Sequence, residues 1–186
     1  MRILAISGSL RRDSYSSGLL RAARELAPAG VEIEIYDDLA EIAAFNEDLE
    51  ESVPAAVADL RERIAAAEAL LIATPEYNGS IPGALKNALD WASRPYGEAA
   101  LVGKPVAVIG SSPSPFGAAW AQEHLRRALS LSGSIVLERE LKVGRVDERF
   151  EDGELIDLGT REELRELVGE LLELAAAGAT ELGAAA

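Results

Sequence analysis

Five short runs of apolar or β-branched residues, each followed by a segment in which apolar residues recur at helical spacing, constrain this chain more than any other feature. Uninterrupted apolar runs are typical of strands buried on both faces, and their alternation with helices predicts a parallel sheet covered on both sides. We expect one three-layer α/β domain over residues 1–178 and a frayed tail over 179–186. The predicted strands are residues 3–6, 31–36, 69–73, 105–109 and 134–137.

The predicted helices lie between and after these strands. The helix that follows the last strand is expected over residues 160–175, with Thr160 as its N-cap and Glu163 completing a capping box. Residues 142–157 are predicted either to be irregular or to carry a small hairpin around Asp152-Gly153. The earlier helices are expected from about residue 17, from residue 54, over 82–91 and over 118–131.

Three loops rich in Gly, Ser, Pro and Asn follow the first, third and fourth predicted strands, at residues 7–17, 74–80 and 110–117. In a parallel sheet the ends of these strands meet at one edge, and ligands of such folds bind at that edge. The coincidence of three such loops therefore predicts one composite binding site.

The first of these loops has the composition of an anion cradle. It joins an apolar strand to a helix, so unpaired N–H groups and the positive end of the helix dipole face the loop. Phosphate is the usual anion at such a position. The loop adds four serine hydroxyls and two guanidiniums, from Ser7, Ser9, Ser14, Ser16, Arg11 and Arg12.

Charge and composition exclude several classes of protein. A formal net charge of −14 repels nucleic acid and anionic lipid, so neither is an expected partner. Because the chain has no cysteine, it has no disulfide, thiolate nucleophile or thiolate metal site. No apolar run approaches the ~20 residues of a membrane span. The run after Met1-Arg2 is too short for a signal peptide, so we expect a cytoplasmic protein.

Two motifs carry a resemblance to a known family. Gly8-Ser-Leu-Arg-Arg-Asp-Ser14 and the longer Pro75-Glu-Tyr-Asn-Gly-Ser-Ile-Pro-Gly-Ala-Leu-Lys-Asn-Ala-Leu-Asp-Trp91 resemble the NADPH-dependent FMN reductase family, which includes chromate and quinone reductases and related azoreductases. The resemblance covers nearly the whole chain. It implies a flavodoxin-like fold with strand order 2-1-3-4-5, bound FMN, NADPH or NADH as reductant, and a homodimer or homotetramer.

The resemblance also implies the residues of the site. It places the FMN phosphate at the first loop, the isoalloxazine against the second, and two serines of the third loop beside the ring. The sequence differs from the family pattern at Ser16, Ser114-Pro115, Trp120 and Glu123. The implied cofactor-binding residues are Ser9, Arg11, Ser14, Ser16, Pro75, Glu76, Tyr77, Asn78, Gly79, Ser111 and Ser112.

A flavin carries its own redox chemistry, so no catalytic side chain or metal is expected. The implied activity is ping-pong hydride transfer from NAD(P)H through FMN to a quinone, free flavin, azo compound or metal oxyanion such as chromate. The alternatives are a flavodoxin-type electron carrier that does not use nicotinamide, and a nucleotide-binding module without redox activity.

Several prominent residues have a simpler interpretation. Glu76 is then a charge at a helix entry, and Lys86 and Asp90 form an exposed helix pair. Trp91 is expected in the core or an interface, and His124, the only histidine, in a structural or interfacial role. Residues 82–92 and 93–103 are the candidate contacts between subunits.

Overall fold

The sheet is parallel, and its first four strands follow the predicted order. The computed structural model describes the backbone of residues 1–184 and the side chains of residues 1–178. The order β2-β1-β3-β4-β5 confirms the flavodoxin-like arrangement. Ile3 pairs with Ile33 on one side and Ala69 on the other, which places β1 in the middle of the sheet. These strands are β1 Arg2–Ser7, β2 Glu32–Tyr36, β3 Ala69–Thr74 and β4 Pro105–Ser112.

The fifth position of the sheet differs from the prediction because it is filled by two short strands. Both β5 (Ile135–Val136) and β6 (Leu141–Gly144) pair with β4. β6 lies where an irregular segment was expected, so that prediction was wrong. Arg126 explains the interruption: its guanidinium binds the carbonyl oxygens of Leu137 and Glu138, at 2.7 and 3.3 Å, which takes them out of the ladder.

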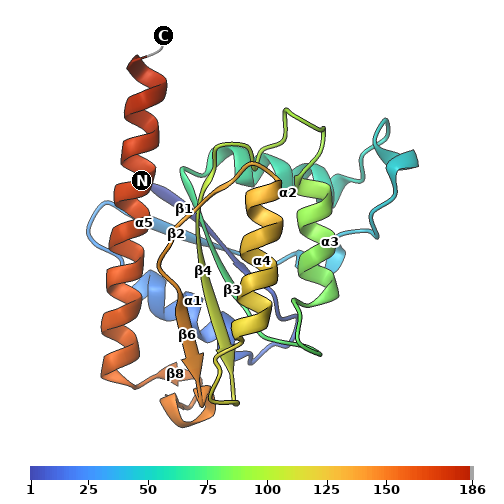
Figure 1. The fold of residues 1–186 in the computed structure, drawn as a ribbon. Helices are drawn as coiled ribbons and strands as arrows, with labels where there is room; N and C mark the ends of the chain where they lie inside the picture. The colour runs from blue at the N-terminus through green and yellow to red at the C-terminus, as the bar shows by residue number, and fades with distance from the viewer. Residues whose placement is uncertain (185–186) are drawn as a thin grey trace.

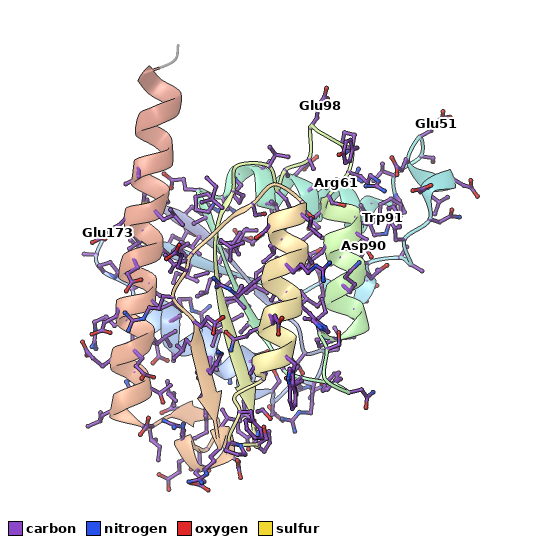
Figure 2. The ribbon with its side chains drawn as sticks, viewed as in Figure 1. Glu51, Arg61, Asp90, Trp91, Glu98 and Glu173 are labelled. Atoms are coloured by element: carbon purple, nitrogen blue, oxygen red, sulfur yellow. The ribbon has the colours of Figure 1, made fainter. Side chains whose placement is uncertain are left out.

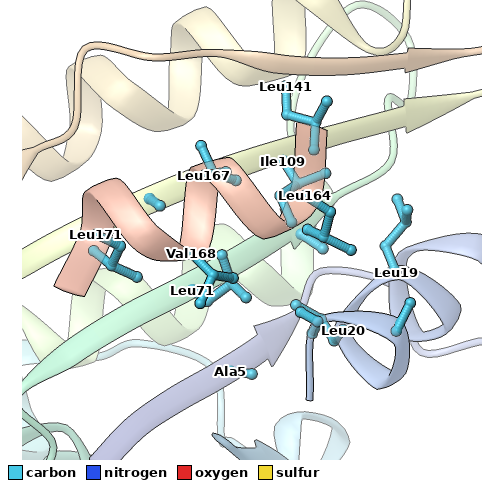
Figure 3. Packing of buried hydrophobic residues seen from close by; sticks show 14 of the residues in the cluster. Ala5, Leu19, Leu20, Leu71, Ile109, Leu141, Leu164, Leu167, Val168 and Leu171 are labelled. Atoms are coloured by element: carbon cyan, nitrogen blue, oxygen red, sulfur yellow. The ribbon is translucent and has the colours of Figure 1, made fainter. Parts of the chain in front are cut away.

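Helices cover both faces of the sheet, as expected for three layers (Figure 1). α1 (Tyr15–Leu26) and α5 (Leu158–Ala184) lie on one face. Figure 3 shows Leu164 and Val168 of α5 packed against strand residues such as Leu71. The other face is covered by α2 Ala55–Ala66, α3 Gly83–Ala92 and α4 Ala119–Leu131.

Trp91 belongs to the core of the second face, which decides between the two roles predicted for it. The side chain is fully buried, and its indole N–H donates to the carbonyl oxygen of Ala43 at 2.7 Å. Phe45 meets the indole edge-on, with ring centroids 4.9 Å apart. Arg61 donates to the Trp91 carbonyl from α2 (Figure 2). These contacts hold the 37–53 segment, with its short helices η1 (Leu39–Glu41) and η2 (Glu47–Leu49), against α3.

The predicted hairpin around Asp152-Gly153 is confirmed. β7 (Phe150–Glu151) and β8 (Glu154–Leu155) pair antiparallel, after the short helix η3 (Val146–Arg149). Asp152 and Gly153 both have positive φ, at 48° and 82°, as a tight two-residue turn requires. Phe150 of this hairpin packs on α1, where a Cβ at Gly18 would lie 2.5 Å from its ring.

α5 begins at Leu158, and Asp157 rather than Thr160 caps it, so the predicted capping box was wrong. Asp157 Oδ1 accepts hydrogen bonds from the Thr160 N–H at 2.8 Å and from the Arg149 guanidinium at 2.7 Å. The Thr160 hydroxyl and N–H, with Arg149, hold the pKa of Asp157 below its ordinary value. The helix continues to Ala184. The frayed tail expected over 179–186 stays a prediction, and residues 185 and 186 lie outside the described part of the chain.

We expect Asp157→Ala to lower the free energy of unfolding by about 1 kcal/mol at pH 7, because the N–H groups of the first turn lose their acceptor. The folded-state pKa is lowered, so the contribution of the carboxylate is present above its unfolded pKa and is lost as the pH falls through the folded value. Urea unfolding at pH 7 and in acid measures both effects. The control is Glu163→Ala, at an exposed residue. An equal loss of stability in that variant would mean that the capping box of Thr160 and Glu163 contributes after all.

Candidate functional site

The three predicted loops meet at the carboxyl edge of the sheet and enclose a cavity of about 420 Å³. This volume lies within the range of about 300–1,000 Å³ that is usual for small-molecule sites. Nine of the eleven predicted site residues line it, together with Tyr15 and Pro113, which the sequence did not single out. The nine are Ser9, Arg11, Ser14, Ser16, Pro75, Glu76, Tyr77, Ser111 and Ser112.

The two remaining predicted residues, Asn78 and Gly79, are not among the lining residues. They form the tip of a tight turn, with φ of 53° and 73°, between Tyr77 and Ser80, whose backbones exchange hydrogen bonds of 3.0 and 3.1 Å. Positive φ at both central positions is the signature of a two-residue hairpin turn. This turn carries Tyr77 at the cavity, and a contact of Asn78 or Gly79 with the flavin stays a prediction.

Serine hydroxyls fix the shape of the first loop. Ser14 is the N-cap of α1: its Oγ accepts from the Ser17 N–H at 3.1 Å and donates to Ser17 Oγ at 2.8 Å. Ser17 in turn donates to Ser7 Oγ at 2.9 Å, and the Arg11 N–H donates to Ser9 Oγ at 3.3 Å. The hydroxyls therefore hold the loop open around the N-terminus of α1, whose first N–H groups face the cavity end.

Arg11 is the cation of the cavity. Among the described residues it has no carboxylate partner, and its guanidinium lies over the ring of Tyr15, 5.7 Å from the centroid. Tyr15 in turn packs against Phe150, with centroids 5.3 Å apart. Since this stack leaves the hydrogen-bonding edge of the guanidinium free, Arg11 can receive an anion.

Ser16 and Ser111 join the first loop to the third. Their hydroxyl oxygens lie 2.9 Å apart, and the two residues are 1% and 4% exposed. Ser16 is one of the positions at which the sequence differs from the family pattern. Its short side chain is held by the end of β4 and thereby closes the cavity between α1 and β4.

Glu76 joins the second loop to the third. Its Oε2 accepts hydrogen bonds from the backbone N–H groups of Trp120 and Ala121, at 3.1 and 3.2 Å. These N–H groups open α4, whose N-cap Ala118 provides no side-chain acceptor. The carboxylate of Glu76 is thus a charge at the start of α4, which it stabilises across the cavity wall, and its predicted contact with the flavin stays a prediction.

Glycines allow the third loop to fold back onto the sheet. A Cβ at Gly110 would lie 2.3 Å from both Gly117 O and Gln122 Nε2, and a Cβ at Gly144 would lie 2.5 Å from Pro115 O. The fully buried Gln122 donates to Gly117 O at 3.2 Å. The role of Gln122 could not be predicted from the sequence, because a glutamine within a helix has no pattern that marks it as a partner of a loop.

The predicted Lys86–Asp90 pair is confirmed, and His124 contacts the second loop, while an interfacial role for His124 stays a prediction. His124 Nδ1 lies 3.0 Å from Ser80 Oγ and so ties α4 to the second loop. Lys86 and Asp90 form an exposed ion pair of 2.5 Å on α3. Within the described residues no group of His, Cys, Asp and Glu could hold a metal ion, and no helix is long and apolar enough to cross a membrane.

A family model for NADPH-dependent FMN reductases matches residues 1–148, a span that contains all three loops of the cavity. The chain belongs to this family. An NAD(P)H-dependent FMN reductase of Pseudomonas aeruginosa is 44% identical over 176 residues, which is 93% of this chain and 92% of that protein. A quinone reductase of Escherichia coli K12 is 38% identical over 88% of this chain and 89% of its own.

Solved structures agree with this assignment. FerB from Paracoccus denitrificans, a flavoenzyme NAD(P)H:(acceptor) oxidoreductase, is 35% identical with a TM-score of 0.87, over 95% of this chain and 98% of FerB. A flavodoxin of Pseudomonas aeruginosa shares the fold, with a TM-score of 0.58 at 19% identity. The protein is thus an FMN-dependent NAD(P)H oxidoreductase, as predicted.

Proposed function

We propose that the cavity binds FMN with its 5′-phosphate at the first loop and its ring between the second and third loops. We further propose that the enzyme reduces quinones by a ping-pong mechanism. The observation that supports this most is the lining of the cavity, which combines serine hydroxyls and one guanidinium that has no carboxylate partner among the described residues with the side chains of Pro75, Tyr77 and Pro113. A phosphate needs the first set and a planar ring suits the second.

The donors present fit FMN. Arg11 supplies a guanidinium without a carboxylate partner, and the N-terminus of α1 supplies the positive end of its dipole. The carboxylate of Glu76 lines the same cavity, but the N–H groups of α4 engage it, which reduces its repulsion of a phosphate. Ser9, Ser16 and Ser112 are the hydroxyls that we assign to the cofactor.

Bound FMN would supply the redox chemistry, accepting hydride from NAD(P)H and passing it to the acceptor. The chain's part is to bind and orient. Pro75 and Pro113 flank the proposed ring site, and Tyr77, half exposed at the mouth, is placed to cover one side of it. One open side serves both the reductant and the acceptor in turn, and this alternation is the reason to expect ping-pong kinetics.

Quinones are the acceptors that the relatives support best. The Escherichia coli quinone reductase and a 2-hydroxy-1,4-benzoquinone reductase of a Burkholderia species, 37% identical over 89% of this chain and 91% of its own, carry that activity in their names. Solved azoreductases are only 16–17% identical and share the fold alone. Reduction of free flavin, azo compounds or chromate is therefore the secondary expectation.

We also propose a cytoplasmic homodimer or homotetramer with residues 93–103 in the contact. Tyr96 of that loop is 91% exposed, which is unusual for a large aromatic side chain. Trp91 of α3, by contrast, is fully buried and so is not available to a partner.

Two anaerobic half-reactions test the proposed function. One equivalent of NADPH should bleach the ~450 nm band of the FMN-loaded protein, and one equivalent of benzoquinone should restore it. Steady-state double-reciprocal plots at several quinone concentrations should then be parallel. Intersecting lines would exclude the ping-pong order. A protein that dithionite bleaches but NADPH and NADH do not would instead be an electron carrier.

A further inference from the structure

Beside the proposed FMN cavity lies an exposed aromatic pair whose rings have no role in the functions assigned above. Phe116 and Trp120 are 61% and 54% exposed. Their ring centroids are 5.9 Å apart, and the ring planes are tilted by 37°. α4, which carries Trp120, begins at the edge of the sheet at which β4 ends (Figure 1). Large apolar side chains that gather on an exposed surface indicate a place where a ligand or a partner binds.

Hydrogen bonds connect this aromatic pair to the cavity wall. The Trp120 N–H donates to Oε2 of Glu76, which lines the cavity, at 3.1 Å. The Phe116 N–H donates to Ser114 Oγ at 3.4 Å, and the Ser114 N–H donates to Oγ of Ser112, which also lines the cavity, at 3.1 Å. The backbones of both aromatic residues are therefore held against the wall, one through the second loop and the other within the third.

The cavity itself leaves little room for a second molecule. Its volume of about 420 Å³ is near the lower end of the range that is usual for one small molecule, so FMN would fill most of it. An electron acceptor then needs a surface outside the cavity, next to the open side of the flavin. Tyr77 is half exposed at the mouth, and the aromatic pair adjoins the same wall.

Two neighbouring rings suit a planar aromatic acceptor. Aromatic rings attract one another in offset and edge-to-face arrangements, and each ring contributes a large apolar surface. A fused two-ring molecule covers more of this surface than a single ring does, and the stabilisation grows with the apolar area that is covered. Trp120 is one of the positions at which the sequence differs from the family pattern, so this surface belongs to this chain and is not implied by the resemblance.

We propose that Phe116 and Trp120 bind the electron acceptor and make the enzyme prefer fused-ring quinones, such as naphthoquinones, to single-ring benzoquinones. This inference rests on the proposed function, which places the flavin ring in the cavity and makes a quinone the acceptor. The two side chains act by binding the acceptor, and neither takes part in the transfer of hydride. They therefore lower the KM for a naphthoquinone and leave kcat unchanged.

Steady-state kinetics with 1,4-naphthoquinone and benzoquinone test the preference. The double variant F116L/W120L keeps apolar side chains but removes both rings. In this variant the KM for naphthoquinone should rise about tenfold, while kcat stays the same and the KM for benzoquinone changes much less. F116L/W120F, which keeps one ring, should recover part of the loss. The control is L131A, which removes an exposed apolar side chain from the other end of α4 and should change neither KM.

Tryptophan fluorescence gives a readout that needs no turnover. The chain has two tryptophans, of which Trp91 is fully buried and Trp120 is half exposed. Titration of the oxidised, FMN-loaded protein with naphthoquinone in the absence of NAD(P)H should quench the fluorescence of Trp120 until it saturates. W120F should lose this saturating component, and F116L should shift its midpoint to higher naphthoquinone concentration. A linear decrease without saturation, or the same saturating quench in W120F, would overturn the inference.

The kinetic outcomes separate this inference from the proposed function. The same KM for naphthoquinone in F116L/W120L and in the unmodified protein would overturn the inference, as would an equal rise for benzoquinone or in L131A. If a second copy of the chain covers the pair instead, F116L/W120L would change the sedimentation coefficient and leave the KM unchanged, which also overturns it. If neither quinone reoxidises the reduced flavin, the proposed function fails, but the fluorescence titration still decides whether the pair binds naphthoquinone.

Discussion

Gly110→Ala is expected to lower the free energy of unfolding by about 3 kcal/mol and to weaken FMN binding at the same time. Gly110 lies in β4, paired with Thr74 of β3 and Lys142 of β6, so the strand cannot move aside. The added Cβ would lie 2.3 Å from the backbone oxygen of Gly117 and from the amide of the fully buried Gln122. Residues 113–117 of the third loop must therefore shift, and they carry Pro113 of the cavity wall.

Chemical unfolding and FMN titration of the same preparations measure the two effects. Gly169→Ala is the control with the opposite sign: Gly169 lies within α5 with no atom within 4 Å of an added Cβ, so alanine there should stabilise by about 0.5–1 kcal/mol. If Gly110→Ala does not fold, the same replacement in a Gln122→Ala background removes one of the two clashes. Unchanged stability and FMN affinity in Gly110→Ala would show that the third loop is not held this way.

The sheet could be predicted from sequence because its central strands are buried on both faces. Such strands need uninterrupted apolar runs, and residues 3–6 and 69–73 show them plainly. The division of the fifth sheet position into two short strands, β5 and β6, could not be predicted. It depends on Arg126, which binds carbonyl groups eleven and twelve residues further along the chain. Leu141–Gly144 is a strand only because β4 extends beside it.

The cap of α5 shows the limit of local patterns. Thr160 and Glu163 have the spacing of a capping box, but Asp157 reaches the same N–H group and also has Arg149 as a partner. The capping box therefore does not form, because the Asp157 carboxylate, which Arg149 also binds, accepts the hydrogen bond from the Thr160 N–H. The motif covers only residues 160–163, which include neither Asp157 nor Arg149, so it cannot predict the cap that forms.

The site was largely predictable because loops that follow parallel strands meet at one edge. What sequence could not show is how the loops hold one another. The bond of Glu76 to the start of α4 and the contact of Ser16 with Ser111 both join residues more than forty positions apart. Tyr15 was missed because an aromatic residue beside a phosphate motif has no distinctive pattern. The structure places it under the Arg11 guanidinium.

Binding of FMN and of riboflavin to Arg11→Ala tests the central claim most directly, because riboflavin lacks only the phosphate. Loss of a hydrogen bond to a charged group should weaken FMN binding by about 1.5–3 kcal/mol and leave riboflavin binding unchanged. Arg11→Lys should retain part of the FMN affinity. R127A, which removes a positive charge of the same kind from α4, should bind FMN and riboflavin as tightly as the unmodified protein does. Unchanged FMN affinity in Arg11→Ala, or an equal loss for riboflavin, would contradict the assignment of the first loop to the phosphate.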